Sequence, residues 1–299
     1  MEQPLVSIVV VSYNHSKYIR ENLDSIKAQT YPNIELIIAD DASKDNSVEV
    51  FESWLAENNY PAKKNFHQQN TGLATTLNEC TDMISGKYVK MIAADDYLHP
   101  EAIEKCVAKL EGLGEEYGMV FTDIYAVNEK SAMRSELYGT LSTFADYEPD
   151  KLKKALLKDN IIPALTVVMK TFVLKETGLY DNSYLTEDYY RWLKINNKYH
   201  IAFIPQKLAY YRLHETNISN TRLDKILEDN VRLKILYDHD GISKEFVNNY
   251  FLQHYITGKR LNKEASALYK NYSFKIKRLD YALRYNIPVS IYKRILKYL

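Results

Sequence analysis

The sequence is poor in glycine. Only 9 of its 299 residues are glycine, and none lies between Met1 and Thr71. Dinucleotide-binding folds and P-loop enzymes need a glycine-rich turn after the first strand, because the backbone must approach phosphate there. The missing glycines therefore argue strongly against a Rossmann dehydrogenase, a P-loop enzyme and a sugar nucleotidylyltransferase.

Cysteines and long apolar runs are scarce as well. The two cysteines, Cys80 and Cys106, each fall within a predicted helix, so no disulfide framework or zinc pattern follows, which suits a reducing cytoplasm. The apolar run at residues 5–11 is too short to span a bilayer and has no basic segment before it. We therefore expect a cytoplasmic protein without signal peptide or anchor, with the inner face of the plasma membrane as a further location.

The chain has no net charge, because Lys+Arg and Asp+Glu both total 39. No global field attracts nucleic acid, and we expect no nucleic-acid partner. The exception is residues 269–299, where eight basic residues face one acidic residue, Asp280, giving a net charge of +7. Tyr, Ile and Leu interleave with these charges, as in helices that lie on anionic membranes. The alternative is a solvated helix face that packs against the rest of the protein.

Strand and helix patterns alternate along the first part of the chain. Apolar runs predict strands at residues 5–12, 34–40, 64–68, 88–94 and 119–127, and amphipathic patterns predict helices at 17–29, 45–58, 72–85 and 100–112. Such alternation predicts βαβ units with right-handed crossovers, and hence an α/β fold with a mostly parallel central sheet and flanking helices.

The pattern changes in the second half. Charged residues and Gly139 predict a mobile excursion over the sheet at residues 128–163. Order resumes at residues 165–170, with a helix near 187–197 and paired strands at 201–204 and 207–213. From about Thr221 the patterning is continuously helical. We therefore expect a catalytic domain at residues 1–220 and a helical C-terminal region at 221–299.

Asp95 and Asp96 follow the predicted strand at 88–94 directly. Ligands bind at the carboxyl ends of strands in open α/β sheets, and two adjacent carboxylates there repel each other unless a cation or donor groups compensate. Hard cations such as Mg²⁺ or Mn²⁺ suit carboxylate ligands best. The alternative is an acidic first turn of the helix that begins near Pro100.

Two further turns end neighbouring strands. Ser12-Tyr-Asn-His15 offers an aromatic ring and an amide that could stack on a base and bind its edge, although an Asx turn that caps the next helix explains it equally well. Asp41 is a second carboxylate at the predicted edge, and it suits a base carrying an N–H, such as N3 of uracil. Its neighbours Ser43 and Asp45 are candidate caps of the following helix.

Glu187 and Asp188 precede an amphipathic helix, so the pair is either helix-dipole chemistry or catalytic. An inverting sugar transfer needs one carboxylate to accept the proton of the acceptor hydroxyl. His214 and Arg212, at the end of the strand at 207–213, are candidates to bind a metal or a diphosphate, although a lone His at a strand end is more often structural.

The chain resembles the inverting glycosyltransferases of family 2, which have the GT-A fold. The resemblance covers about residues 4–220 and rests on an ordered series of motifs. These are Val-Ser-Ile-Val-Val-Val-Ser-Tyr-Asn at 6–14, the segment 29–45 with Asp-Asp-Ala-Ser at 40–43, Asn-Thr-Gly-Leu at 70–73 with Asn78, Gly-Lys-Tyr-Val at 86–89, Ala-Asp-Asp-Tyr-Leu-His-Pro at 94–100, Thr-Glu-Asp at 186–188 with Arg191 and Trp192, and Tyr-Arg-Leu-His at 211–214.

The resemblance implies roles at matching positions. Asp188 would be the general base and Asp95 the metal-binding carboxylate, with Asp96, Glu187 and His214 as further metal candidates. The chain departs from the family's Asp-x-Asp motif, because Ala93 occupies its first position. The resemblance therefore does not supply the ribose contact usually made there, and Asp96 would take part of that role. The implied donor-binding set is Ser12, Tyr13 on the base, Asn14, Asp41 on the uracil, Asn70, Asp96 and Arg212.

The expected activity is an inverting, Mn²⁺- or Mg²⁺-dependent transfer of one sugar from a nucleotide-sugar, with UDP-sugars favoured. The resemblance implies a saccharide or lipid-linked saccharide acceptor and a place in bacterial surface-polysaccharide synthesis. Two alternatives stay open. One is a non-catalytic nucleotide- or sugar-binding scaffold with the same fold, and the other is a nucleotidyl- or phosphotransferase that uses the same carboxylates.

Overall fold

A computed structural model describes residues 3–134, 141, 148–215, 217 and 221–292. The chain divides into two compact units, one of residues 1–153 with 160–217 and one of residues 154–159 with 218–299. The elements of the first unit are β1 (Val6–Ser12), α1 (Ile19–Lys27), β2 (Ile34–Asp40), α2 (Ser47–Asn58), β3 (Ala62–Phe66), α3 (Leu73–Met83), β4 (Tyr88–Ala93), β5 (Tyr97–Leu98), α4 (Ala102–Glu111), β6 (Tyr117–Asn128), the 3₁₀ turn η3 (Ala164–Thr166), β7 (Val168–Lys170), α6 (Thr171–Glu176), α7 (Glu187–Lys198) and β8 (His200–Leu213). The helix α5 (Pro149–Lys158) is divided between the two units.

The first unit is built on one sheet of eight strands in the order β3-β2-β1-β4-β7-β6-β8-β5. The pairs β1–β2, β1–β4, β2–β3 and β6–β8 are parallel, whereas β7 is antiparallel to both of its neighbours and β5 is antiparallel to β8. The expected α/β fold with a mostly parallel sheet is confirmed. Because Ser12 pairs with Asp40 and Val11 with Ala93, the carboxyl ends of β1, β2 and β4 meet at one edge.

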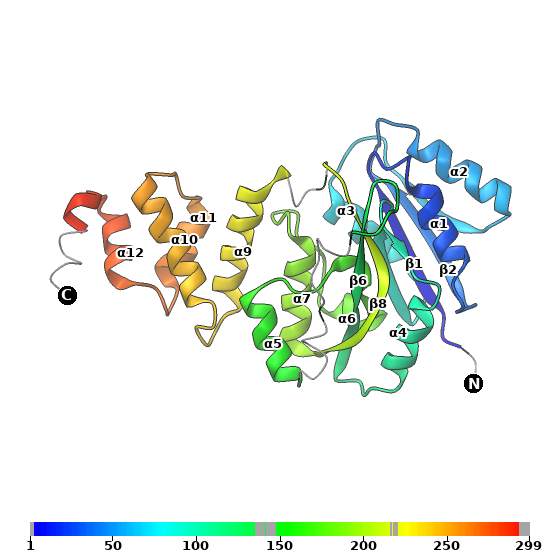
Figure 1. The fold of residues 1–299 in the computed structure, drawn as a ribbon. Coiled ribbons are helices and arrows are strands. Elements are labelled where there is room, and N and C mark those ends of the chain that lie inside the picture. Colours follow the sequence, from blue (N-terminus) through cyan, green and yellow to red (C-terminus); the bar gives the residue numbers. More distant parts are fainter. Residues whose placement is uncertain (1–2, 135–140, 142–147, 216, 218–220, 293–299) are drawn as a thin grey trace. The chain divides into compact units, whose positions relative to one another are not determined.

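Both faces of the sheet are covered, which is why its central strands read as unbroken apolar runs. All seven residues of β1 are buried. Figure 1 shows α1, α2 and α4 on one side of the sheet and α3, α6 and α7 on the other. The core on the first side includes Ile8, Leu23, Phe51 and Ile103.

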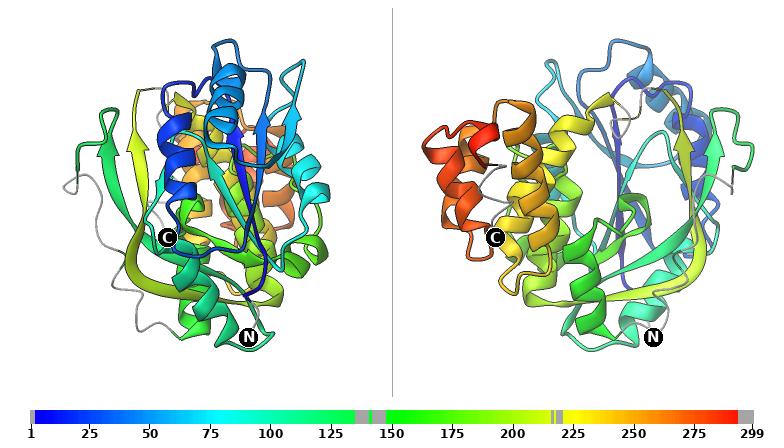
Figure 2. Two further views of the ribbon diagram at one scale, coloured as in Figure 1. Left: turned by 90° about the vertical axis from the view of Figure 1, so that its right-hand side faces the viewer. Right: turned by 60° about the vertical axis from the view of Figure 1, so that its left-hand side comes forward.

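The prediction of two paired strands at 201–204 and 207–213 is wrong. They form the single long strand β8, which runs parallel to β6, and Figure 2 shows the two side by side. The register jumps between Thr122–Ile204 and Asp123–Lys207, so residues 205 and 206 form a bulge. Pro205 has no N–H to give to the ladder, and a bulge absorbs it without ending the strand.

The excursion predicted at 128–163 is wrong in part. Residues 149–158 form α5, which begins with Pro149 in the first helical turn, where proline is tolerated. Its apolar residues Leu152, Leu156 and Leu157 are buried. Residues 135–140 and 142–147 of the predicted excursion lie outside the described residues.

The second unit is helical, as expected. It contains α9 (Leu223–Tyr237), α10 (Lys244–Thr257), α11 (Lys263–Asn271) and α12 (Lys277–Arg284). Its core includes Val231, Phe251, Tyr269 and Leu279. Cys80 and Cys106 lie in α3 and α4 as buried free thiols. Among the described residues, no helix has the length and apolarity needed to cross a bilayer.

Candidate active site

The turns after β1 and β2 are joined by hydrogen bonds. The backbone N–H of Asn14 donates to Ser43 Oγ over 2.8 Å, and Ser43 Oγ donates to Asp40 Oδ2 over 2.6 Å. Asn14 has a φ of 60°, a left-handed conformation that asparagine tolerates better than most residues, and its Oδ1 accepts from the N–H of Lys44. These bonds fix the turn that carries Tyr13, whose side chain stays 40% exposed and so can offer a ring face to a ligand.

Asp41 is buried and holds the loop before α3. Its Oδ1 accepts from the N–H of Thr71 (2.7 Å) and from His67 Nδ1 (2.8 Å), and its Oδ2 accepts from the N–H of Gly72 (2.8 Å). Burial opposes ionisation of Asp41, but these hydrogen bonds outweigh it and hold the pKa of the carboxyl below its ordinary value. Asn70, which is exposed, donates through Nδ2 to the backbone carbonyl of Asp41.

His67 is a site residue that the sequence did not indicate. Its Nδ1 lies 2.8 Å from Asp41 and its Nε2 lies 2.6 Å from Glu79. Burial lowers the pKa of His67, but the hydrogen bonds and charges of the two carboxylates outweigh burial and raise the pKa above its ordinary value. The imidazolium therefore bridges the end of β2 and the helix α3.

This bridge predicts a pH-dependent contribution to stability. A His with a raised folded pKa stabilises fully below its unfolded pKa of about 6.5, and the stabilisation is lost as pH rises through the folded pKa. We expect His67→Gln to lower the free energy of unfolding by roughly 1.5–3 kcal/mol near pH 6 and by less near pH 9. Urea unfolding at both pH values measures this, with His200→Gln, on an exposed ring, as the control. A loss that is equal at both pH values would contradict the bridge.

Asp95 lies between two histidines. Its Oδ2 is 2.9 Å from His214 Nε2 and 3.7 Å from His15 Nε2, and its Oδ1 is buried without a hydrogen-bond partner. Burial opposes ionisation, but the hydrogen bond from His214 and the charges of both histidines hold the pKa of Asp95 below its ordinary value. A buried, ionised oxygen without a donor is suited to a cation.

Asp96 is adjacent in sequence but differs in environment. Its Oδ1 accepts from the backbone N–H of Arg212 over 2.9 Å, and this hydrogen bond connects β8 to the turn after β4. Burial, together with the negative charge of Asp95, raises the pKa of Asp96 well above its ordinary value. The two environments therefore move the two pKa values apart, and Asp95 is the more readily ionised carboxylate.

Arg212 is buried and bound within the protein. Its Nε donates to the carbonyl of Asp95 over 2.7 Å, its Nη1 donates to the carbonyl of Asn128 over 3.1 Å, and its Nη2 pairs with the carboxylate of Glu21. The guanidinium also lies 4.7 Å from the centre of the Tyr18 ring. These contacts are all within the protein, and they hold the backbone at Asp95 and Asn128 together with the side chain of Glu21.

Helix α1 and the residue before it contribute three residues that the sequence analysis missed. Asn22 Nδ2 donates to the carbonyl of Asp96 over 2.8 Å, Glu21 binds Arg212, and the ring of Tyr18 stacks on that of His214 at 5.7 Å. The three residues lie at i, i+3 and i+4, which is one face of a helix. This shared face was the only sign in the sequence that the three residues could act together. It was missed because the polar face of an amphipathic helix is usually solvated.

Asp188 and Glu187 lie in the first turn of α7, in a different environment. Both line a pocket, together with Leu77, Met91, Ala164, Val167, Met169, Tyr180 and Trp192. Asp188 Oδ1 accepts from the N–H of Tyr189, and its Oδ2 accepts from Asn160 Nδ2 over 3.1 Å. Burial is the main cause that raises the pKa of Asp188, and a raised pKa suits a carboxylate that must take up a proton.

Two other motif residues hold the wall of this pocket. Asn78 donates to the carbonyl of Tyr180 over 3.0 Å and accepts from its N–H over 2.8 Å. Arg191 Nη1 donates to the carbonyl of Gly178 over 2.6 Å, and its guanidinium lies 4.0 Å from the centre of the Tyr180 ring. Both side chains therefore act by fixing residues 178–180.

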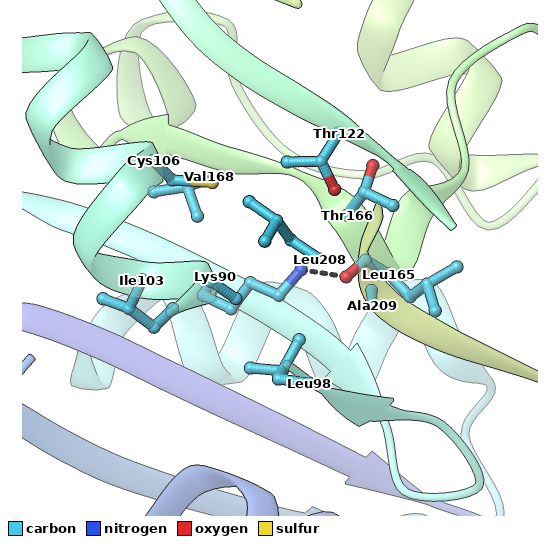
Figure 3. Close-up of a pocket in the computed structure, with 11 residues that line it drawn as sticks. Lys90, Leu98, Ile103, Cys106, Thr122, Leu165, Thr166, Val168, Leu208 and Ala209 are labelled. Carbon is cyan, nitrogen blue, oxygen red and sulfur yellow. Dashed lines mark hydrogen bonds between the residues drawn. The ribbon is translucent and has the colours of Figure 1, made fainter. Parts of the chain in front are cut away.

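A second, apolar pocket contains the buried side chain of Lys90. Figure 3 shows Lys90 directed at Leu165, whose carbonyl accepts from Nζ, and the carbonyl of Val167 lies 3.2 Å from the same atom. Burial lowers the pKa of Lys90 to about 7. The lysine anchors η3 and the residue after it, which also form part of the pocket beside Asp188.

Within the part of the chain that is described, no three His, Cys, Asp or Glu side chains converge on a point that could hold a metal. The available donors are Asp95, with its unpartnered Oδ1, and the neighbouring His214. A cation that arrives with a diphosphate needs only one or two protein ligands, so this donor set fits such a cation. Asp96 is directed to Arg212, and Glu187 lies with Asp188 at the pocket.

Several known proteins are similar to this chain. Residues 7–175 match the family model described as glycosyl transferase family 2. An uncharacterized glycosyltransferase of Rickettsia typhi is 31% identical over 228 residues, which is 75% of this chain and 69% of that protein. One from Haemophilus influenzae is 29% identical over 310 residues, which is 98% of this chain and 95% of that protein.

Two solved structures are similar in fold. TarS 1–349 of S. aureus, in complex with UDP-GlcNAc, has a TM-score of 0.69 at 18% identity, with 92% of this chain and 83% of that chain covered. The mannosyltransferase PcManGT of Pyrobaculum calidifontis, in complex with GDP-Man and Mn²⁺, has a TM-score of 0.63 at 17% identity, with 90% and 79% covered. These likenesses confirm the expected GT-A fold.

Proposed function

The chain belongs to glycosyl transferase family 2 and is a glycosyltransferase, and from this premise we propose that it transfers one sugar from a nucleotide-sugar to a saccharide hydroxyl with inversion. The observation that carries the proposal is that two carboxylates, Asp95 and Asp188, have different chemical environments. Asp95 is ionised beside two histidines, whereas Asp188 has a raised pKa beside a pocket. Environments that separate two pKa values mark groups with different tasks.

The donor is proposed to lie over the carboxyl ends of β1, β2 and β4. The exposed ring of Tyr13 would stack on the base, and Ser12, Asn14 and Asn70 would border it. Asp41 Oδ2 accepts from Gly72 and keeps a lone pair for the N–H of a uracil, which favours UDP. Among the structural neighbours, TarS was solved in complex with UDP-GlcNAc and the mannosyltransferase in complex with GDP-Man. The identity of the donor nucleobase must therefore be tested directly.

Asp95 and His214 would hold the divalent cation, Mn²⁺ or Mg²⁺. When bound, the cation stabilises the negative charge of the departing nucleoside diphosphate. Ala93, at the first position of the motif, is exposed and offers no carboxylate to the ribose. Asp96 does not replace it directly, because its carboxylate binds Arg212; we assign to Asp96 and Arg212 the positioning of the turn that carries Asp95.

Asp188 is proposed to accept the proton of the acceptor hydroxyl as its oxygen attacks the anomeric carbon from the side opposite the diphosphate. The new glycosidic bond forms, the bond to the diphosphate oxygen breaks, and configuration inverts. Asn160 donates to Asp188 and would orient the carboxylate. A hydrogen bond from a neutral donor leaves the carboxylate able to act as a base.

A donor panel tests the proposal. UDP- and GDP-sugars are compared by thermal shift with and without Mn²⁺, because a ligand that binds only the native state raises the melting temperature. Release of nucleoside diphosphate from the stabilising donor is the expected result. Binding without any turnover would favour the non-catalytic scaffold, and release of pyrophosphate would favour a nucleotidyltransferase.

We further propose an acceptor of bacterial surface polysaccharide, in saccharide or lipid-linked form, reached at an anionic membrane through the segment 269–299. Tyr269, Tyr272 and Leu279 belong to the core of the helical unit, so the segment is structural as well. In and directly after α12, Lys277, Arg278, Tyr281 and Tyr285 are exposed, and their spacing places them on one helical face. Tyrosine and basic residues suit a membrane interface.

The exposed face of α12 gives a test that leaves the core intact. We expect the protein to sediment with anionic vesicles at low salt and to be released at high salt, because each basic residue contributes about 1 kcal/mol and salt screens it. Lys277→Glu with Arg278→Glu should abolish sedimentation. Glu substitutions at Lys153 and Lys154, which are adjacent and exposed on α5, are the matched control. Equal sedimentation of all three proteins would contradict the membrane contact.

A further inference from the structure

The pocket beside Asp188 has a composition that a simple hydroxylated sugar does not explain. Five of its lining residues are aliphatic or Met side chains, namely Leu77, Met91, Ala164, Val167 and Met169. Tyr180 and Trp192 add aromatic surface, while the only charged residues are Glu187 and Asp188. We propose that this pocket binds the acylamino group of an N-acylated sugar at the transfer site, an inference that rests on the proposed function.

The apolar lining selects for a methyl group. A sugar hydroxyl placed among Leu77, Met91 and Met169 would lose its water hydrogen bonds without gaining protein partners, which is costly. A methyl group gains from the same surroundings through burial. The acyl methyl of an N-acetyl group is the part of an acylated sugar that fits this lining.

Trp192 supplies a donor for the acyl oxygen. Its side chain is 3% exposed, and its Nε1 is buried without a hydrogen-bond partner. Buried indole N–H groups usually have an acceptor, so a small shift of the indole on binding would bring this N–H to an acceptor of the ligand. An amide carbonyl is a strong acceptor, and the amide N–H can in turn donate to the carboxylates of α7.

The pocket is preformed, as a specific binding site should be. The Lys90 amine, which lies in the separate cavity of Figure 3, binds the carbonyls of Leu165 and Val167 and so fixes the turn that contributes Ala164 and Val167 to the pocket. Asn78 fixes Tyr180 on the other wall. These bonds fix the two walls before a ligand binds, so only the Trp192 side chain has to move.

The chain contains only two tryptophans, so ligand binding at the pocket can be followed by the fluorescence of Trp192. Trp54 lies on α2, where its Nε1 donates to Asp24, so Trp54→Phe leaves Trp192 as the sole tryptophan. In this variant we expect the fluorescence of Trp192 to respond to an N-acetylated sugar and much less to its hydroxyl counterpart. The donor arm compares UDP-GlcNAc with UDP-glucose, and the acceptor arm compares the methyl glycosides of N-acetylglucosamine and glucose in the presence of UDP.

Each outcome decides the proposal. Discrimination in the donor arm assigns the acyl group to the donor, and discrimination in the acceptor arm assigns it to the acceptor. No discrimination in either arm overturns the proposal, as does stronger binding of a 6-deoxy sugar, which carries a methyl group without the carbonyl. Fluorescence is read without turnover, so a protein that binds acylated sugars but transfers none would refute the proposed function and leave this inference intact.

A substitution in the otherwise native chain completes the test. Trp192→Phe keeps the aromatic ring and removes the N–H, so the affinity ratio of acylated to hydroxyl sugar, measured by calorimetry, should fall by about 5- to 10-fold, the effect of one hydrogen bond. Trp54→Phe should leave the ratio unchanged. UDP affinity should be the same in both variants, which shows that each is folded. An unchanged ratio in Trp192→Phe would contradict the role of the indole.

Discussion

Asp188→Asn is expected to lower turnover by roughly 10²–10⁴-fold while donor affinity stays near that of the wild type. Asparagine keeps the shape of the side chain but cannot accept the proton of the acceptor hydroxyl. Asp188 lines the pocket on α7, and neither Asp95 nor His214 is among its lining residues, so the affinity for the nucleotide should not change. Steady-state kinetics and calorimetry with the selected donor measure the two quantities.

Two controls make this result specific to the base. Asp82→Asn removes an exposed carboxylate of α3 and should have no effect on turnover. Glu187→Gln removes the other carboxylate at the pocket and should reduce turnover less than Asp188→Asn. If Asp188→Asn retains normal turnover while Glu187→Gln loses it, the base is Glu187.

Asp95→Asn is expected to abolish the Mn²⁺-dependent part of UDP binding and to reduce transfer by orders of magnitude. The substitution removes the ionised oxygen that lacks a partner, and the cation would have few other protein ligands. Calorimetry of UDP with and without Mn²⁺ separates the metal-dependent part of the affinity from the remainder.

Asp96→Asn provides the matched control at the neighbouring position. Because the pKa of Asp96 is raised, its protonated form, which the asparagine amide resembles, is more favoured than in an ordinary carboxyl, and the amide oxygen can still accept from the N–H of Arg212. We expect this variant to keep most of the metal-dependent affinity. An equal loss in both variants would place both carboxylates on the metal, and full activity of Asp95→Asn in excess chelator would remove the metal from the account.

The fold was predictable where the pattern of apolar residues in the sequence indicates which segments are buried. The apolar runs of β1, β2 and β4 and the alternation with α1 to α4 predict the parallel part of the sheet. The two-residue strand β5 is too short to leave a pattern. In β8, a proline and a polar residue resemble a turn, and only the long partner β6 shows that they form a bulge.

The candidate site was predictable where it is local. The order of motifs in the sequence named Asp41, Asp95 and Asp188 as candidates, and in the structure each of them follows or begins a regular element. The partners of Arg212 were not predictable, because Glu21 lies 191 residues away in sequence and is brought near only by the packing of α1. The same holds for the pocket beside Asp188, which combines α3, β4, β7 and α7.

The most direct test of the account is the product of a transfer reaction with a nucleotide-sugar of known anomeric configuration. Nuclear magnetic resonance of the reaction reports both the configuration of the new glycosidic bond and the form in which the nucleotide leaves. The account predicts a glycoside of inverted configuration together with free nucleoside diphosphate, dependent on Asp188. Retention of configuration, or release of a nucleoside monophosphate and pyrophosphate, would contradict it.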